Sequence, residues 1–127
     1  MRRSLQITIA VFSLAPLIFS LLNWYLGAAR YMPVEDIVPA IDSQFRFQSG
    51  VYLSAALLLW WMIPKIERMT VPFSIVVFGI FIGALGRFIS HQQFGPAPGF
   101  VSVGMWFELS MPALIIWQRL VATRSAD

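Results

Sequence analysis

The sequence predicts an all-α fold, an integral membrane four-helix bundle whose N and C termini are both cytoplasmic. The 127 residues are 58% hydrophobic and only 12% charged, and the mean hydropathy is +0.74. Soluble domains are about one quarter charged, so this composition excludes a solvated surface, a disordered chain and a nucleic-acid-binding platform. A membrane helix needs ~20 apolar residues, and the chain has room for four. We expect one membrane domain over residues 1–127, with spans at about residues 5–29, 45–63, 71–90 and 100–118.

The first apolar run follows Arg2 and Arg3, which is also how a secretory signal begins. The hydrophobic region of a signal covers only ~7–15 residues. This run is longer and ends in Asn23-Trp24-Tyr25, with aromatic residues typical of a membrane interface. We therefore expect an uncleaved first span.

The other runs have boundaries of the same kind. The second ends in Trp60-Trp61 and Pro64, and the third has Pro72 in its first turn, where the missing N–H costs no helical hydrogen bond. The fourth has a tryptophan near each end. The connection at residues 33–39 has acids just after a proline, which predicts a short surface helix. The connection at residues 94–99 is a proline-glycine turn.

Lys and Arg residues predict the orientation. Six lie at the termini and in the turn at residues 64–70, and three lie on the opposite side of the predicted spans. The positive-inside rule then places both termini and that turn in the cytoplasm. The six are Arg2, Arg3, Lys65, Arg68, Arg119 and Arg124, and the three are Arg30, Arg46 and Arg87.

One acid lies deep in a predicted span. Glu108 is eight residues beyond Phe100, hence ~12 Å into the span, where an unpaired acid costs ~2.5–3.5 kcal/mol. Arg87 lies close to the outer end of the third span and could reach Glu108. We therefore expect a polar cluster in the outer half of the bundle, made of Asn23, Arg46, Arg87, His91 and Glu108.

Three interpretations of this cluster remain open. It could bind a small anionic or amphipathic ligand, since two arginines and one acid favour an anion. It could be a buried ion pair that fixes helix packing, as in a structural or accessory membrane subunit. It could belong to a lipid- or quinone-modifying enzyme with His91 as acid or base, although no nucleophile accompanies it, so no catalytic residue is assigned.

Small residues predict where helices meet, because membrane helices pack through glycine and serine. A possible homo-oligomer would use the face of Gly79 and Gly83. The glycines expected at helix contacts are Gly50, Gly79, Gly83, Gly86 and Gly104.

The remaining expectations concern partners. The chain has no cysteine and one histidine, so no metal site and no cofactor is expected. The expected partners are the lipid bilayer and the small ligand, and no nucleic acid.

Three ordered segments carry a resemblance that covers the chain from the first span to Gln118. They are Phe45-Arg46-Phe47-Gln48-Ser49-Gly50-Val51-Tyr52, then Gly86-Arg87-Phe88-Ile89-Ser90 with Gly95-Pro96, then Glu108-Leu109 with Pro112 and Trp117. This set resembles the bacterial inner-membrane family known as domain of unknown function 4345. The resemblance implies a multi-pass protein of the bacterial cell inner membrane with marker positions Arg46, Arg87, Gly95, Pro96 and Glu108. It implies no biochemical role, and Ser49 stands where a second glycine is common in the family.

Overall fold

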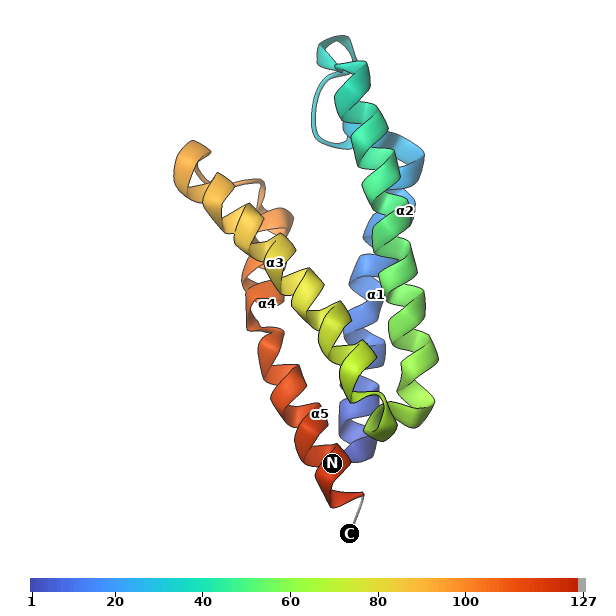
Figure 1. Ribbon diagram of the computed structural model, residues 1–127. Coiled ribbons are helices and arrows are strands. Elements are labelled where there is room, and N and C mark those ends of the chain that lie inside the picture. The colour runs from blue at the N-terminus through green and yellow to red at the C-terminus, as the bar shows by residue number, and fades with distance from the viewer. Residues whose placement is uncertain (126–127) are drawn as a thin grey trace. The chain divides into compact units, whose positions relative to one another are not determined.

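The computed structural model describes residues 1–125, and these residues form helices joined by short connections (Figure 1). No strand occurs among them, which confirms the predicted all-α class. The long helices are α1 (Arg2–Leu26), α2 (Pro39–Met62), α3 (Thr70–Phe94), α4 (Gly99–Ser110) and α5 (Pro112–Arg124). Three short 3-10 helices are η1 (Gly27–Arg30), η2 (Val34–Asp36) and η3 (Ile63–Arg68).

Four helical segments are long and apolar enough to cross a membrane, as the sequence predicts. They are Arg2–Arg30, Pro39–Arg68, Thr70–Phe94 and Gly99–Arg124. Only 17% to 28% of the most apolar part of each segment is buried within the protein. Most of the large aliphatic and aromatic side chains of these helices therefore face outward.

The fourth predicted span contains two helices, α4 and α5, which meet at Met111. Pro112 has no N–H to bond the carbonyl oxygen of Glu108 four residues earlier. The amide of Met111 bonds that oxygen instead, at 3.2 Å, and the helix restarts at Pro112 as α5. The break lies three residues beyond Glu108. The connection at residues 33–39 contains only the short 3-10 helix η2.

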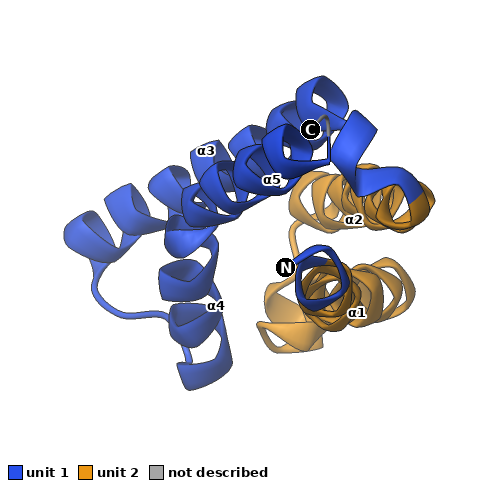
Figure 2. Cartoon of the chain, turned by 90° about the horizontal axis from the view of Figure 1, so that it is seen from below, with its two compact units in different colours: residues 1–5, 65–127 blue, residues 6–64 orange. Residues whose placement is uncertain are grey.

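The chain divides into two compact units, which Figure 2 shows in different colours. One of them, orange in Figure 2 and here called the hairpin unit, covers residues 6–64 and contains α2 and nearly all of α1. The other, blue in Figure 2 and here called the C-terminal unit, combines residues 1–5 with the chain from Lys65 onward and contains α3, α4 and α5.

Side-chain hydrogen bonds fix α1 antiparallel to α2 in the hairpin unit. Near the start of α1, Gln6 Nε2 donates to the carbonyl oxygen of Ile63 at 2.8 Å. Further along, Trp60 Nε1 donates to Ser13 Oγ. Ser13 and Ser20 are both buried at 1% exposure, and each also bonds a carbonyl oxygen three residues earlier in α1. Small polar residues thus line the inner face of α1, as expected for membrane helices.

In the C-terminal unit, α3 packs against both α4 and α5. The buried residues of α3 are spaced by threes and fours, which places them along one helix face. Across from them, Gln118 of α5 is fully buried and donates to the carbonyl oxygen of Ile66 at 2.8 Å and to Thr70 Oγ1 at 3.0 Å. The buried residues of α3 are Phe73, Val77, Ile80 and Ala84.

Candidate functional site

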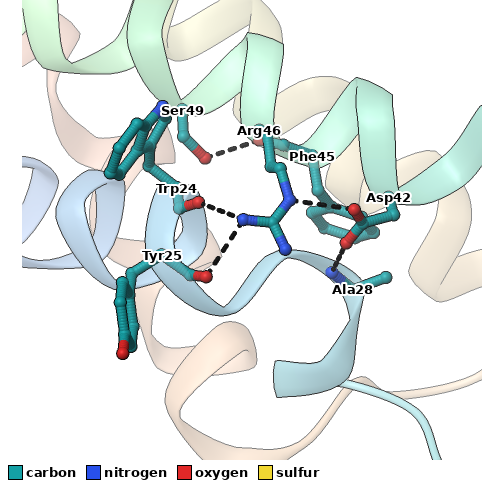
Figure 3. A network of polar contacts seen from close by, with 7 residues as sticks. All are labelled: Trp24, Tyr25, Ala28, Asp42, Phe45, Arg46 and Ser49. Atoms are coloured by element: carbon teal, nitrogen blue, oxygen red, sulfur yellow. Dashed lines mark hydrogen bonds and ion pairs between the residues drawn. The ribbon is translucent and has the colours of Figure 1, made fainter. Parts of the chain in front are cut away.

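Arg46 joins the start of α2 to the end of α1 (Figure 3). Its Nη1 donates to the carbonyl oxygens of Trp24 and Tyr25, at 2.7 and 3.0 Å. These carbonyls belong to the last turn of α1, where helical partners run out and where the helix dipole favours a cation. The guanidinium of Arg46 therefore serves as a cap on α1.

Asp42 completes this contact from the preceding turn of α2. Its Oδ2 accepts from Arg46 Nε at 2.8 Å, and its Oδ1 accepts from the backbone N–H of Ala28 at 2.9 Å (Figure 3). The intervening Gly27 has φ +58°, the left-handed conformation that ends many helices. A Cβ at Gly27 would overlap Asp42 Oδ1 and lie 2.9 Å from Arg46 Nη2. Gly27, Asp42 and Arg46 form what we call the α1 clamp.

Asn23 lies in a neighbouring group of contacts in the hairpin unit. Its Oδ1 accepts from Arg30 Nη1 at 2.6 Å and from the hydroxyl of Tyr31 at 3.0 Å. The guanidinium of Arg30 also stacks 4.8 Å from the ring centroid of Phe19. Asn23 thus holds the η1 segment that follows α1.

Arg87 and Glu108 meet across α3 and α4 in the C-terminal unit. Arg87 Nε lies 3.5 Å from Glu108 Oε2, and the side chains are 44% and 13% exposed. A Cβ at Gly104, one turn before Glu108, would lie 3.7 Å from Arg87 Nη1, so α4 presents its backbone beside the arginine. The contact leaves four of the five N–H donors of Arg87 without a hydrogen-bond partner among the described residues.

His91 follows Arg87 by one helical turn on α3. Its ring lies edge-on to Trp106 of α4, with centroids 6.5 Å apart, and Trp106 also contacts Phe88 edge-on at 5.9 Å. The Nδ1 atom of His91 is buried and has no hydrogen-bond partner within residues 1–125. An unsatisfied buried ring nitrogen is costly, which makes this atom a candidate for contact with a ligand.

A small pocket opens where α3 ends and α4 begins, and we call it the α3–α4 pocket. Its volume is about 100 Å³, and its lining combines a guanidinium, an imidazole and two hydroxyls with apolar groups. Gly95 shapes the connection, because its φ of +90° with ψ of 179° is open only to glycine. The lining residues are Arg87, Ser90, His91, Gly95, Ala97, Val101, Ser102 and Met105.

The five residues of the predicted polar cluster fall into two groups. Arg87, His91 and Glu108 lie in the C-terminal unit, where Arg87 contacts Glu108 and lines the pocket with His91. Asn23 and Arg46 lie in the hairpin unit, each with its own contacts.

Three residues of the hairpin unit take part in the contacts of Asn23 and Arg46 but lie outside the predicted polar cluster: Gly27, Arg30 and Asp42. Two of these residues, Asp42 and Gly27, lie in sequence patterns that indicate their contacts. Asp42 and Arg46 are four residues apart, the spacing of a helical ion pair, and a glycine after a long apolar run is typical of a helix end. The contact between Arg30 and Asn23 depends on the η1 turn, which no pattern in the sequence predicts.

The glycines expected at helix contacts differ from one another. A Cβ at Gly50, Gly79, Gly83 or Gly86 would meet no atom within 4 Å, whereas Gly104 lies beside Arg87. The first four glycines are therefore open in the structure. Their packing role stays a prediction, and it would need contacts from outside their own unit.

Comparison with known protein families gives a match. The model of a protein family described as "Domain of unknown function (DUF4345)" matches residues 4–118. Searches of the curated proteins and of the solved structures give no match. The matched region runs from α1 into α5 and includes both the α1 clamp and the α3–α4 pocket, so the chain belongs to the family of this domain of unknown function, DUF4345.

Proposed function

We propose that this chain is a multi-pass protein of a bacterial inner membrane. In this proposal, both termini and η3 are cytoplasmic, and the α3–α4 pocket binds the anionic end of a small or amphipathic ligand without enzymatic chemistry. The outward-facing apolar side chains support the membrane location, because four such helices in water would expose far more apolar surface than soluble proteins do. The positive-inside rule supports the orientation.

The observation that carries the binding proposal is the pair of unsatisfied groups in the pocket. His91 Nδ1 is buried without a hydrogen-bond partner, and Arg87 in the same lining has N–H donors to spare. A guanidinium matches carboxylate and phosphate oxygens with two parallel hydrogen bonds. Arg87 therefore suits an oxyanion, and so does His91 in the form whose Nδ1 carries the proton and donates.

The size of the pocket limits the ligand. Pockets that enclose drug-sized ligands have ~300–1,000 Å³, whereas this one has about 100 Å³, room for about three waters. A carboxylate or phosphate group fits, and the rest of an amphipathic ligand would lie outside the pocket, along the apolar helices. Glu108 balances the charge of Arg87 and holds it in place.

The contacts in the hairpin unit favour a second function, that of a structural or accessory membrane subunit. Arg46 bonds Asp42 and two carbonyl oxygens of the last turn of α1, and these contacts favour a role in folding. The open face at Gly79 and Gly83 could then receive a helix of a second copy. Because the chain has no cysteine, Gly83→Cys gives a clean crosslinking probe. A strictly monomeric product would contradict this second function.

Native mass spectrometry of protein purified from membranes tests the binding proposal. We expect the wild type to retain a small acidic molecule and His91→Ala to lose it. Gln92→Ala is the matched control, since Gln92 is the exposed neighbour of His91 and does not line the pocket. Wild type without a bound molecule, or His91→Ala with the same adduct as the control, would contradict the proposal.

A further inference from the structure

Three distant segments of the chain meet at one end of the C-terminal unit. The start of the chain contacts η3, since Arg2 Nε lies 3.0 Å from Glu67 Oε2. It also contacts the end of α5, since Arg124 Nη1 lies 2.8 Å from Met1 Sδ. The chain start, η3 and the end of α5 therefore form a single surface, which we call the basic end.

A buried hydrogen bond holds this surface together from within. Gln118 of α5 has no exposed surface and donates to the carbonyl oxygen of Ile66 in η3, and Ile66 itself is fully buried. A buried hydrogen bond fixes its two segments more firmly than exposed ion pairs do. The positions of the charges on η3 and α5 are therefore set by the fold.

The basic end carries a large excess of positive charge. Among the described residues, these three segments contain a single acidic residue, Glu67. Glu67 forms an ion pair with Arg2. The basic residues are all exposed: Arg2, Arg3, Lys65, Arg68, Arg119 and Arg124.

Three of these arginines have no partner of their own. The side chains of Arg3, Arg68 and Arg119 make no hydrogen bond or ion pair with any other residue in the range 1–125. Each is next to a residue that ties the surface together, since Arg3 follows Arg2, Arg68 follows Glu67 and Arg119 follows Gln118. Three guanidiniums without a partner among the described residues thus lie on the chain start, η3 and α5, the three segments that these contacts join.

We propose that the basic end is a binding site for the headgroup of an anionic phospholipid. Orientation in the membrane needs only positive charge, which lysine supplies as well as arginine. Phosphate recognition gains from guanidiniums, because they bind two oxygens at once. Basic clusters at the cytoplasmic membrane surface bind anionic headgroups. This inference rests on the membrane orientation in the proposed function and does not involve the α3–α4 pocket.

The test is the thermal stability of the purified protein in a neutral detergent. A detergent micelle does not have two different sides, so the effect of these charges on membrane orientation does not influence the measured Tm. We expect phosphatidylglycerol to raise the Tm in a saturable way, and phosphatidylcholine with the same acyl chains to leave it nearly unchanged. Inorganic phosphate at the same concentration should have little effect. Equal responses to both lipids, or a full response to phosphate alone, would overturn the proposal.

The variant Arg3→Gln/Arg68→Gln/Arg119→Gln locates the site. We expect it to need about tenfold more phosphatidylglycerol, or more, for the same shift in Tm. The control Val34→Glu/Ala40→Glu/Gln44→Glu lowers the net charge by the same amount on exposed positions of the hairpin unit, and it should respond like the wild type. An unchanged response in the arginine variant would overturn the proposal. If that variant does not fold, the responses of the wild type to phosphatidylglycerol, phosphatidylcholine and inorganic phosphate decide whether the proposal holds.

Resistance of the wild type to alkaline extraction from membranes separates this inference from the proposed function. A protein that stays in the membrane but does not distinguish the two lipids contradicts the inference alone. A protein that is extracted contradicts the proposed membrane location.

Discussion

Arg87 Nε lies 3.5 Å from Glu108 Oε2, and this contact joins α3 to α4 beside the α3–α4 pocket. Glu108 is 13% exposed and Arg87 is 44% exposed, so the acid is the more deeply placed partner. The pair holds a guanidinium at the edge of the pocket and leaves most of its donors available. The ion pair therefore positions Arg87 and also stabilises the contact between α3 and α4.

Removal of the charge of Glu108 should destabilise the C-terminal unit. Glu108→Gln leaves Arg87 without its counter-charge, and we expect a loss of about 1 kcal/mol, since the arginine is partly exposed and pairs between membrane helices are worth little more. The measurement is the Tm of the detergent-purified protein, with an expected drop of about 4 °C. Glu35→Gln makes the same chemical change at an exposed site and should have no effect. Equal Tm values for the two variants would show that the ion pair of Arg87 and Glu108 does not contribute to stability.

The α1 clamp predicts that two glycines respond in opposite ways to alanine. Gly27→Ala forces a left-handed alanine into overlap with Asp42, and we expect a loss of about 2 kcal/mol or more. Gly50→Ala adds a methyl group in open space within α2 and should gain about 0.5–1 kcal/mol. Thermal unfolding of both variants checks this prediction. A tolerated Gly27→Ala would show that the clamp does not form as described.

Within the clamp, arginine should not be replaceable by lysine. Arg46 bonds Asp42 through Nε and two carbonyl oxygens through Nη1, whereas the single nitrogen of a lysine cannot occupy both places. We expect Arg46→Lys to lose about 1–2 kcal/mol of unfolding free energy.

A double-mutant cycle with Asp42→Asn and Arg46→Gln isolates the contact between these two side chains. We expect the effects to be non-additive by about 0.5–1 kcal/mol, because the residues touch. Additive effects would assign the stability to the separate contacts with α1.

The sequence predicts the helices better than it predicts their contacts. Four apolar runs predict four segments of membrane length, because hydropathy depends on composition alone. The break at Met111 follows from Pro112, which removes a helical hydrogen bond. Whether such a proline ends the helix or only bends it in a membrane span depends on the neighbouring helices. The fourth predicted span therefore keeps its place, within Gly99–Arg124, and consists of the two helices α4 and α5.

The polar cluster shows which side-chain contacts can be predicted from the sequence and which cannot. A deep acid needs a partner, and the level of Arg87 on α3 is enough to suggest one. The contacts of Arg46 depend instead on the left-handed turn at Gly27, which points the backbone of Ala28 at Asp42. Turn geometry of this kind is decided by tertiary contacts, so the depth of Arg46 in its predicted span does not predict its contacts with Asp42, Trp24 and Tyr25.

The central claim is that the α3–α4 pocket binds an anionic group, and a comparison of decanoate with decanol tests it most directly. The two molecules share a chain and enter detergent micelles alike, but only decanoate has a carboxylate. At tenfold excess over its dissociation constant, decanoate should stabilise the wild type by about 1.4 kcal/mol, a rise in Tm of about 6 °C. Gln92→Ala should respond in the same way, and His91→Ala should respond to decanoate no more than to decanol. Equal shifts with decanoate and decanol in the wild type would contradict the account.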